Sequence, residues 1–483
     1  MHFLHAFNRL CVAGGLAVVL AATSFAAPAK SLAGEPQTEA PLGRQSKTFE
    51  TAADYLVEFY PLWFTHYQSQ SADFQSKIPT KNRLIGPDRI SPVYKLVVAI
   101  NVDTLYASSF LDLSGQPLIL EIPKTTATYS IMTLDRFGNI FDSGIPAGEH
   151  GLYGLTGPSF TGKMPPGVTP VAMPLDFPAL IFRVDKHSAA GDDERREANE
   201  FRKAIKTLPL CKYLNKNCPD GTPPGGKTLI VPEILFSKPF KQKADALAQD
   251  APIRFLKQIQ VAVASPQTPP LTRAQQELSA RFNTMFGDGE NLSSSDRHDL
   301  RQGARFGHQM ILNHYQNSSG VNNWIHFTNI GAWGKQSLDR AAITEYIQYG
   351  NSQATAAYYH TFKDGKGRSL DGTDPRGYEL HFAADELPEA SRFWSVTAYT
   401  PAAVELVKNT ADKYVVASYT RGLRYNRDGS LTIVLARALP DGVPKANWLP
   451  VPKGAFNIML RVYGPEGSVA DDTYVPPAIA RRK

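Results

Sequence analysis

Apolar residues alternate with polar ones in short runs in the first and last parts of the chain, and this pattern predicts β-strands. The expected strands are residues 94–100, 116–122, 128–134, 179–184, 378–382, 393–399, 414–417, 431–436 and 456–463. Gly, Pro, Asn and Asp separate these runs, as they commonly do between strands. Short strands without intervening helices are typical of antiparallel β-sandwiches and jelly rolls.

The middle of the chain changes to the spacing of helices, with apolar residues every three or four positions and few β-branched residues. The expected helices are residues 241–264, 272–286 and 295–315, then one or two more up to about residue 362, and an earlier one at 52–67. Ser293 is a candidate N-cap for the helix at 295–315, and Asp296 favours its first turn.

These patterns predict a protein that is mainly β with some α structure, with two jelly-roll-like antiparallel β-sandwich domains joined by a helical middle region. The chain has 483 residues, of which 42% are hydrophobic, so it is long enough for several domains with ordinary cores. The expected organisation is a signal peptide at 1–27, a disordered leader at 28–50, an N-terminal β domain at 51–238, a helical region at 239–362 and a C-terminal β domain at 363–483.

The first residues have the order of a secretory signal peptide. Arg9 precedes an apolar stretch at 11–22, and small residues follow, so cleavage is expected near Ala26 or Ala27. The alternative is an anchor helix that stays in the membrane, for which the apolar stretch is short. We therefore expect a protein of the periplasm, or a secreted one, without a transmembrane segment in the mature chain.

Charge and cysteine content narrow the range of partners. The chain has 51 Lys and Arg against 45 Asp and Glu, and no basic block exceeds the terminal Arg481, Arg482 and Lys483, so no nucleic-acid partner is expected. Cys211 and Cys218 are expected to form a disulfide in an oxidising compartment. A metal pair is the alternative, but no His or third Cys lies near them in the sequence.

No motif indicates a cofactor or a metal. Residues 221–228 match a phosphate-binding loop letter for letter, but Pro223 and Pro224 lack the backbone N–H groups that such a loop uses. His308 and His314 are separated by about 240° around a helix, so they face different ways. We therefore expect no cofactor and no metal, and we expect these histidines at a surface or an interface.

A group of polar residues directly follows the expected strand at 94–100. On a strand, Asn101 and Asp103 share one face, while Thr104 and Tyr106 share the other. An amide beside a carboxylate at a strand end suits hydrogen bonding to a ligand, and it also suits the anchoring of a tight turn. Both interpretations remain open.

The aromatic residues of the last third are open to two interpretations as well. Rings on strands usually form a core, although rings that line a concave sheet bind sugars or apolar ligands. Trp394, Trp448 and Tyr463 fit either role.

Two parts of the chain resemble known domain families of unknown function. Residues 101–106, together with 129–135 and Arg183, resemble the exported bacterial domain numbered twelve fifty-four. Residues 331–334 and the segment from Phe393 to Pro477 resemble its usual partner, numbered twelve fourteen.

This resemblance implies two jelly-roll-like β domains joined through helices, and an oligomer, but no settled activity or catalytic residues. The chain departs from the family pattern at two positions. Ile100 stands where a Pro usually precedes the Asn, and Gly86 stands where a His is common. Chemistry that depends on this His in relatives is therefore in doubt in this chain.

Our preferred hypothesis is an exported β-sandwich protein that binds a small molecule or a glycan in a cleft between its two β domains. The expected ligand-binding residues are Asn101, Thr104, Trp394, Ser395 and Arg461.

The alternative is a hydrolase-type enzyme that uses the same cleft. Asp103 would act as the acid or base, with Tyr106 or Ser395 assisting, and Arg340 or Arg461 would stabilise negative charge. A structural or assembly protein that forms a homo-oligomer is a third possibility, by analogy with jelly rolls.

Overall fold

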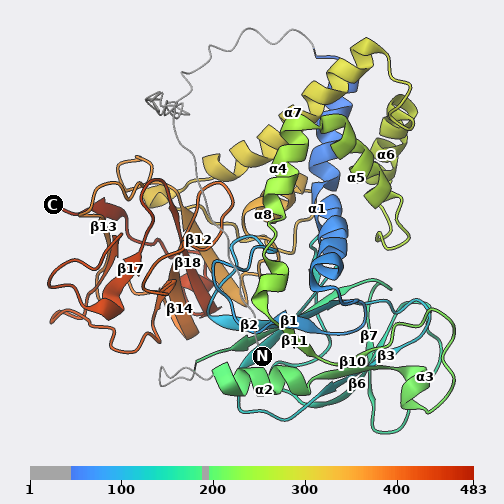
Figure 1. Cartoon of the computed structure of the whole chain (residues 1–483), viewed down its shortest axis with the longest axis horizontal. Coiled ribbons are helices and arrows are strands. Elements are labelled where there is room, and N and C mark those ends of the chain that lie inside the picture. Colours follow the sequence, from blue (N-terminus) through green and yellow to red (C-terminus); the bar gives the residue numbers. More distant parts are fainter. Residues whose placement is uncertain (1–44, 188–194) are drawn as a thin grey trace, which may run out of the picture. The chain divides into compact units, whose positions relative to one another are not determined.

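The computed structural model describes residues 45–187 and 195–483. The predicted signal peptide at 1–27, its cleavage site, and most of the predicted leader at 28–50 lie outside these residues. The described chain contains an N-terminal group of strands, a group of helices and a C-terminal group of strands (Figure 1).

The N-terminal strands form two sheets that pack face to face. They are β1 (Ile85–Pro87), β2 (Thr104–Phe110), β3 (Leu118–Ile122), β4 (Tyr129–Leu134), β5 (Ile140–Phe141), β6 (Gly151–Thr156), β7 (Thr169–Ala172), β8 (Ala179–Asp185), β9 (Lys206–Pro209), β10 (Gly226–Lys227) and β11 (Leu229–Val231). The sheet orders are β11-β1-β2-β8-β4-β5 and β10-β9-β3-β6-β7. Leu105 and Phe182 from the first sheet share one buried core with Leu120 and Leu155 from the second, so the two sheets make a β-sandwich. The short helices beside these strands are α2 (Arg195–Ala204), α3 (Leu210–Tyr213) and the 3₁₀ helix η1 (Glu233–Phe236).

The helical region is built around the first helix of the chain. Its members are α1 (Lys47–Ser76), α4 (Lys241–Asp250), α5 (Pro252–Val263), α6 (Arg273–Phe286), α7 (Ser294–Asn317) and α8 (Ser337–Tyr346), and a 3₁₀ turn η2 (Val321–Asn323) follows α7. Helix α1 packs against α5, α6, α7 and α8, and Figure 1 shows these helices gathered in one group. A Cβ atom at Gly307 of α7 would lie 2.7 Å from the carbonyl oxygen of Ala53. Glycine at this position therefore lets α7 lie directly against the backbone of α1.

The C-terminal strands form a second sandwich. They are β12 (Ala356–Thr361), β13 (Tyr378–Phe382), β14 (Ala390–Tyr399), β15 (Val415–Ala417), β16 (Leu431–Ala436), β17 (Trp448–Pro450), β18 (Asn457–Pro465) and β19 (Ile479–Arg481), with the short helices η3 (Lys445–Asn447) and α9 (Gly467–Ala470). The sheet orders are β12-β18-β14-β15 and β17-β16-β13-β19. Val396 and Leu460 from one sheet share a buried core with Leu380 and Ile433 from the other.

This architecture confirms the predicted fold class, mainly β with α, in which two β-sandwiches are accompanied by a helical region. Most neighbouring strands are antiparallel, although three pairs, β1 with β11, β6 with β7 and β16 with β17, are parallel. Helix α1 begins at Lys47, inside the last residues of the expected leader, and it packs with the helical region instead of the N-terminal strands.

Several local predictions are also confirmed. Ser293 caps α7 by accepting a hydrogen bond from the N–H of Asp296 at 3.0 Å. Cys211 and Cys218 form a disulfide. The expected helix at 241–264 is interrupted, because Pro252 starts a new helix, α5, directly after α4.

The expected strand at 94–100 is wrong, because this apolar segment is irregular chain. Other segments satisfy its backbone groups. The N–H of Lys95 donates to the carbonyl of Phe236 at 2.9 Å, and the N–H of Ala99 donates to that of Val404 at 3.0 Å. The segment is therefore buried without belonging to a sheet. As a consequence, Asn101 and Asp103 lie in the approach to β2 and do not end a strand.

The helix expected up to about residue 362 is also wrong in its last part. Helix α8 ends at Tyr346, and β12 pairs with β18 along its whole length. Tyr358, Tyr359 and Thr361 are strand-forming residue types, and the pairing with β18 provides the neighbour that they require.

Candidate functional site

A cavity lies beside the outer face of the first N-terminal sheet. Its walls come from α1, β1, β2, β8, the irregular segment 94–101, the segment 347–350, Tyr358 of β12 and Arg461 of β18. Its empty volume, including the mouth, is ≈ 990 Å³.

Apolar residues make most of the wall. They are Ala72, Ile85, Pro87, Leu96, Val97, Val98, Ala99, Ile100, Phe110, Ala179, Ile181, Phe236 and Ile347. The charged lining residues are Arg183 and Arg461, and the described lining includes no carboxylate. The charge of this wall is therefore positive.

Arg461 lines the cavity and is buried, with an exposed fraction of 2%. Its Nη2 donates to the carbonyl oxygen of Ala99. Its guanidinium lies 5.9 Å from the ring centre of Tyr358 and 5.5 Å from that of Tyr399. Its Nη1 is buried and has no hydrogen-bond partner among the described residues. Arg461 therefore lines the cavity and has one donor without a protein partner.

Arg183 of β8 is held only by neutral groups. Its Nη1 donates to Asn351 Oδ1 at 2.7 Å, and its Nη2 donates to the carbonyl oxygen of Tyr349. Its guanidinium lies 5.7 Å from the ring centre of Tyr106. Among the described residues, neither Arg183 nor Arg461 makes a direct ion pair with a carboxylate. Burial lowers the pKa of Arg461, but the surrounding tyrosines and the Asp103 carboxylate raise this pKa overall, so Asp103 compensates part of the charge.

Two further buried arginines lie behind the wall. Arg136 lies 5.2 Å from the ring centre of Phe110, and Arg202 donates to the carbonyl oxygen of Pro87 at 3.1 Å. Burial lowers the pKa of Arg136 to about 10 and the pKa of Arg202 to about 9. Both remain protonated at neutral pH, so they add to the positive charge around the cavity.

Tyrosine hydroxyls and amides supply the neutral polar groups of the wall. The hydroxyl oxygen of Tyr106 accepts a hydrogen bond from Asn101 Nδ2 at 2.6 Å, and burial raises the pKa of Tyr106. The hydroxyl oxygen of Tyr358 accepts two hydrogen bonds from Asn351, each at 2.9 Å. These bonds leave the hydroxyl proton of Tyr358 uncommitted.

Asn101 anchors a turn, which is one of the two roles that its sequence position suggested. Its Oδ1 accepts hydrogen bonds from the N–H groups of Asp103 and Thr104, each at 3.0 Å, and so anchors the turn into β2. Its Nδ2 lies at the cavity and donates to the hydroxyls of Tyr106 and Tyr463.

Asp103 joins the two β domains and does not line the cavity. Its side chain is 0% exposed. Its Oδ2 accepts a hydrogen bond from Ser395 Oγ at 2.9 Å, and its Oδ1 accepts one from the hydroxyl of Tyr419 at 2.6 Å. Both partners belong to the C-terminal domain, so this carboxylate is a bridge between the domains.

The remaining candidates lie away from the cavity. Thr104 and Ser395 are fully buried beside Asp103, and Trp394 packs on Phe382 in the C-terminal core at 6.0 Å between ring centres. Arg340 of α8 binds the carboxylate of Glu58 at 2.6 Å in the helical region. Of the predicted site residues, the structure therefore brings Asn101, Tyr106 and Arg461 together at the cavity. The proposed catalytic set requires Arg340 to lie beside Asp103 and Tyr106, and the structure does not bring these three residues together.

Sequence reasoning did not select Arg183, Tyr358 or residues 347–350 as lining residues. Arg183 carried a usable signal, because a charge interrupts the otherwise apolar run at 179–184. The segment 347–350 offered no such signal, since its contribution depends on where α8 ends.

The fold and the cavity define a protein of two β-sandwich domains with a positively charged, mostly apolar cavity. Residues 81–209 match the family model DUF1254, a protein family of unknown function, and residues 355–467 match DUF1214, also of unknown function. The chain therefore carries the predicted pair of domains.

One solved structure of low sequence identity has a similar fold. The VPA0106 protein from Vibrio parahaemolyticus is 19% identical, with a TM-score of 0.57 over 90% of this chain and 100% of its own. An uncharacterised protein from Burkholderia cenocepacia is 15% identical, with a TM-score of 0.39 over 90% of this chain and 94% of its own. No curated protein matches the chain. In the part of the chain that the structure describes, no helix has the length and apolar character needed to cross a bilayer.

Proposed function

We propose that the protein is exported to the periplasm or beyond and binds, in this cavity, a small organic anion with an apolar body. The observation that carries the proposal is the charge of the wall. Arg183 and Arg461 are its charged residues, and neither has a carboxylate partner among the described residues. An anionic group beside Arg461 would accept a hydrogen bond from its unused Nη1.

Physical chemistry favours such a ligand over a neutral one. A buried charge without a counter-ion is unfavourable, and a bound anion would reduce this penalty. The apolar wall would meanwhile gain from covering a hydrocarbon or aromatic body. The amides of Gln68, Asn101 and Gln348 in the wall already donate to other protein groups, so a small molecule fits better than a glycan with its many hydroxyls.

The enzyme hypothesis receives less support. Both carboxylate oxygens of Asp103 already accept hydrogen bonds, and Asp103 lies outside the cavity wall. A homo-oligomer stays a prediction, which light scattering of the mature protein would check.

The binding test compares two ligands that share a chain length and differ in charge. We expect decanoate to bind in a 1:1 complex and decan-1-ol to bind at least about tenfold more weakly, because only decanoate pairs with the arginines. Isothermal titration calorimetry measures both. Equal affinities, or no binding of decanoate at concentrations up to about 1 mM, would contradict the proposal.

A variant then assigns the effect to one residue. Arg461→Met keeps the apolar stem and removes the charge, so we expect decanoate to bind about 10-fold to 100-fold more weakly while decan-1-ol is unaffected. Arg421→Met, at an exposed position, is the matched control and should bind both ligands as the wild type does.

A further inference from the structure

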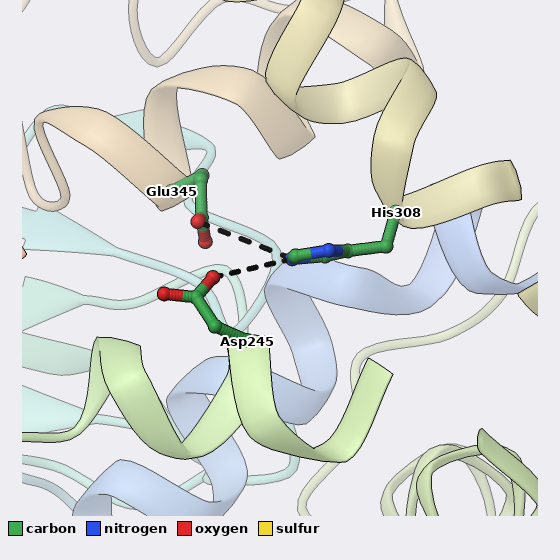
Figure 2. A group of neighbouring side chains, drawn as sticks. All are labelled: Asp245, His308 and Glu345. Atoms are coloured by element: carbon green, nitrogen blue, oxygen red, sulfur yellow. Dashed lines mark ion pairs between the residues drawn. The ribbon is translucent and has the colours of Figure 1, made fainter. Parts of the chain in front are cut away.

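Three side chains that can bind a metal ion converge among the helices α4, α7 and α8. Asp245, His308 and Glu345 each offer one ligand atom, and these atoms all lie within 4.8 Å of one another. Figure 2 shows the imidazole of His308 directed at the two carboxylates. His308, which we expected at a surface or an interface, is in fact 6% exposed.

The distances suit a shared ion better than direct hydrogen bonds. His308 Nε2 lies 3.6 Å from Asp245 Oδ1 and 4.0 Å from Glu345 Oε1. Hydrogen bonds between N and O have lengths of about 2.7–3.2 Å, and this buried Nε2 has no hydrogen-bond partner among the described residues. A tetrahedral metal with bonds of about 2.0–2.2 Å keeps its ligand atoms roughly 3.4 Å apart.

The side chain of Glu345 is also prepared for coordination. The hydroxyl of Tyr60 donates to Glu345 Oε2. This contact fixes the carboxylate of Glu345 and leaves its Oε1 facing His308, in the manner of outer residues that orient metal ligands.

One cation already lies beside the two carboxylates. Lys241 Nζ is 2.5 Å from Glu345 Oε1 and 2.9 Å from Asp245 Oδ2. One ammonium group balances only one of two carboxylates, in a place where Glu345 is 0% exposed. The group therefore keeps an unbalanced negative charge, which a divalent ion would compensate.

We propose that Asp245, His308 and Glu345 bind a divalent first-row transition metal, and that Lys241 is the counter-ion of the same carboxylates in the metal-free protein. Binding displaces the ammonium group from the carboxylate oxygens, and the ion then links α4, α7 and α8. Asp245, whose side chain is 35% exposed, provides the route from solvent. The site is independent of the cavity beside Arg461.

The test measures Zn²⁺ binding to the full chain, expressed without a histidine tag and freed of metal by chelation. Isothermal titration calorimetry should show Zn²⁺ binding that His308→Ala weakens at least about tenfold. His314→Ala is the matched control, because His314 lies on the same helix but pairs with Asp339 at 2.6 Å. It should leave this binding unchanged.

A second variant gives the opposite effect. Lys241→Met removes the competing cation, so we expect tighter Zn²⁺ binding and a larger rise of Tm with Zn²⁺ than in the wild type. The visible spectrum of the Co²⁺-loaded wild type should report nitrogen and oxygen ligands without any substitution. Binding that His308→Ala leaves intact would overturn the proposal. So would an absence of Zn²⁺ binding in both the wild type and Lys241→Met, which would make the cluster an ion-pair network only.

Discussion

The cavity wall and the helical cluster are both buried and charged, but their charges are unbalanced in opposite directions. At the cavity, Arg183 and Arg461 lack carboxylate partners among the described residues. In the helical cluster, Lys241 balances only one of the carboxylates of Asp245 and Glu345. A buried charged group tends to be compensated by a charge of opposite sign. The comparison therefore indicates that the cavity binds an anion and that the helical cluster binds a cation.

The largest expected effect comes from removing the only ammonium group of the helical cluster. Lys241→Met leaves the buried Glu345 and the partly exposed Asp245 without a direct cation, and we expect it to lower the free energy of unfolding by about 3–5 kcal/mol. Urea unfolding without metal measures this change. Lys243→Met, two residues away at an exposed position, is the control. A loss below about 1 kcal/mol in Lys241→Met would show that the carboxylates are not held as charges.

Asp103 tests whether the domain junction beside the cavity is a structural bridge. Asp103→Asn weakens the two hydrogen bonds from Ser395 and Tyr419, because an amide replaces the charged acceptor. We expect a loss of about 2–3 kcal/mol in urea unfolding. Asp385→Asn, at an exposed position, should change stability by less than about 0.5 kcal/mol. An unchanged stability in Asp103→Asn would favour a catalytic carboxylate instead.

Asp185 gives the domain junction a pH dependence of its stability. Burial raises the pKa of Asp185 to about 6, although the guanidinium of Arg392 acts in the opposite direction. The folded protein therefore binds a proton on Asp185 more readily than the unfolded chain does. Its contribution to stability is complete below pH 4 and is lost as the pH rises to about 6, by an amount of about 2–3 kcal/mol.

Unfolding of the wild type and of Asp185→Asn, measured across this pH range, isolates the contribution. We expect the variant to lose less stability than the wild type between pH 4 and pH 6. Parallel curves would mean that Asp185 titrates normally in the folded protein.

The smallest stability effect is expected at the cavity. Arg461→Met removes a buried cation that has no direct ion pair, at the expense of one hydrogen bond to the carbonyl of Ala99 and of the attraction to the Asp103 carboxylate. These contributions oppose each other, so we expect a change within about 1 kcal/mol. Chemical unfolding in the absence of ligand provides the measurement. If Arg461→Met lowered the free energy of unfolding as much as Lys241→Met does, the contrast between the cavity and the helical cluster would be contradicted.

The sequence predicted the second sandwich better than the surroundings of the cavity. The strand at 378–382 matches β13 residue for residue, because alternation and turn residues around it act locally. The segment 94–100 has the same apolar character, yet tertiary contacts with Phe236 and Val404 keep it out of any sheet. The local sequence pattern carries no information about such tertiary contacts.

The helical cluster was beyond prediction for a related reason. Asp245, His308 and Glu345 come from three helices, and the separations between them in the sequence follow no metal-binding pattern. Only the packing of α4, α7 and α8 brings them together. At the cavity, by contrast, Asn101 and Tyr106 were selected from one polar segment of the sequence, and both line the cavity.

The most direct test of the anion-binding cavity is the position of a bound anion. A crystal structure with ω-bromodecanoate would place the bromine by its anomalous scattering and the carboxylate by its density. We expect the carboxylate within hydrogen-bonding distance of Arg461 Nη1, at about 2.7–2.9 Å, and the bromine among the apolar wall residues. A ligand that binds outside the cavity, or that turns its carboxylate away from Arg461 and Arg183, would contradict the account.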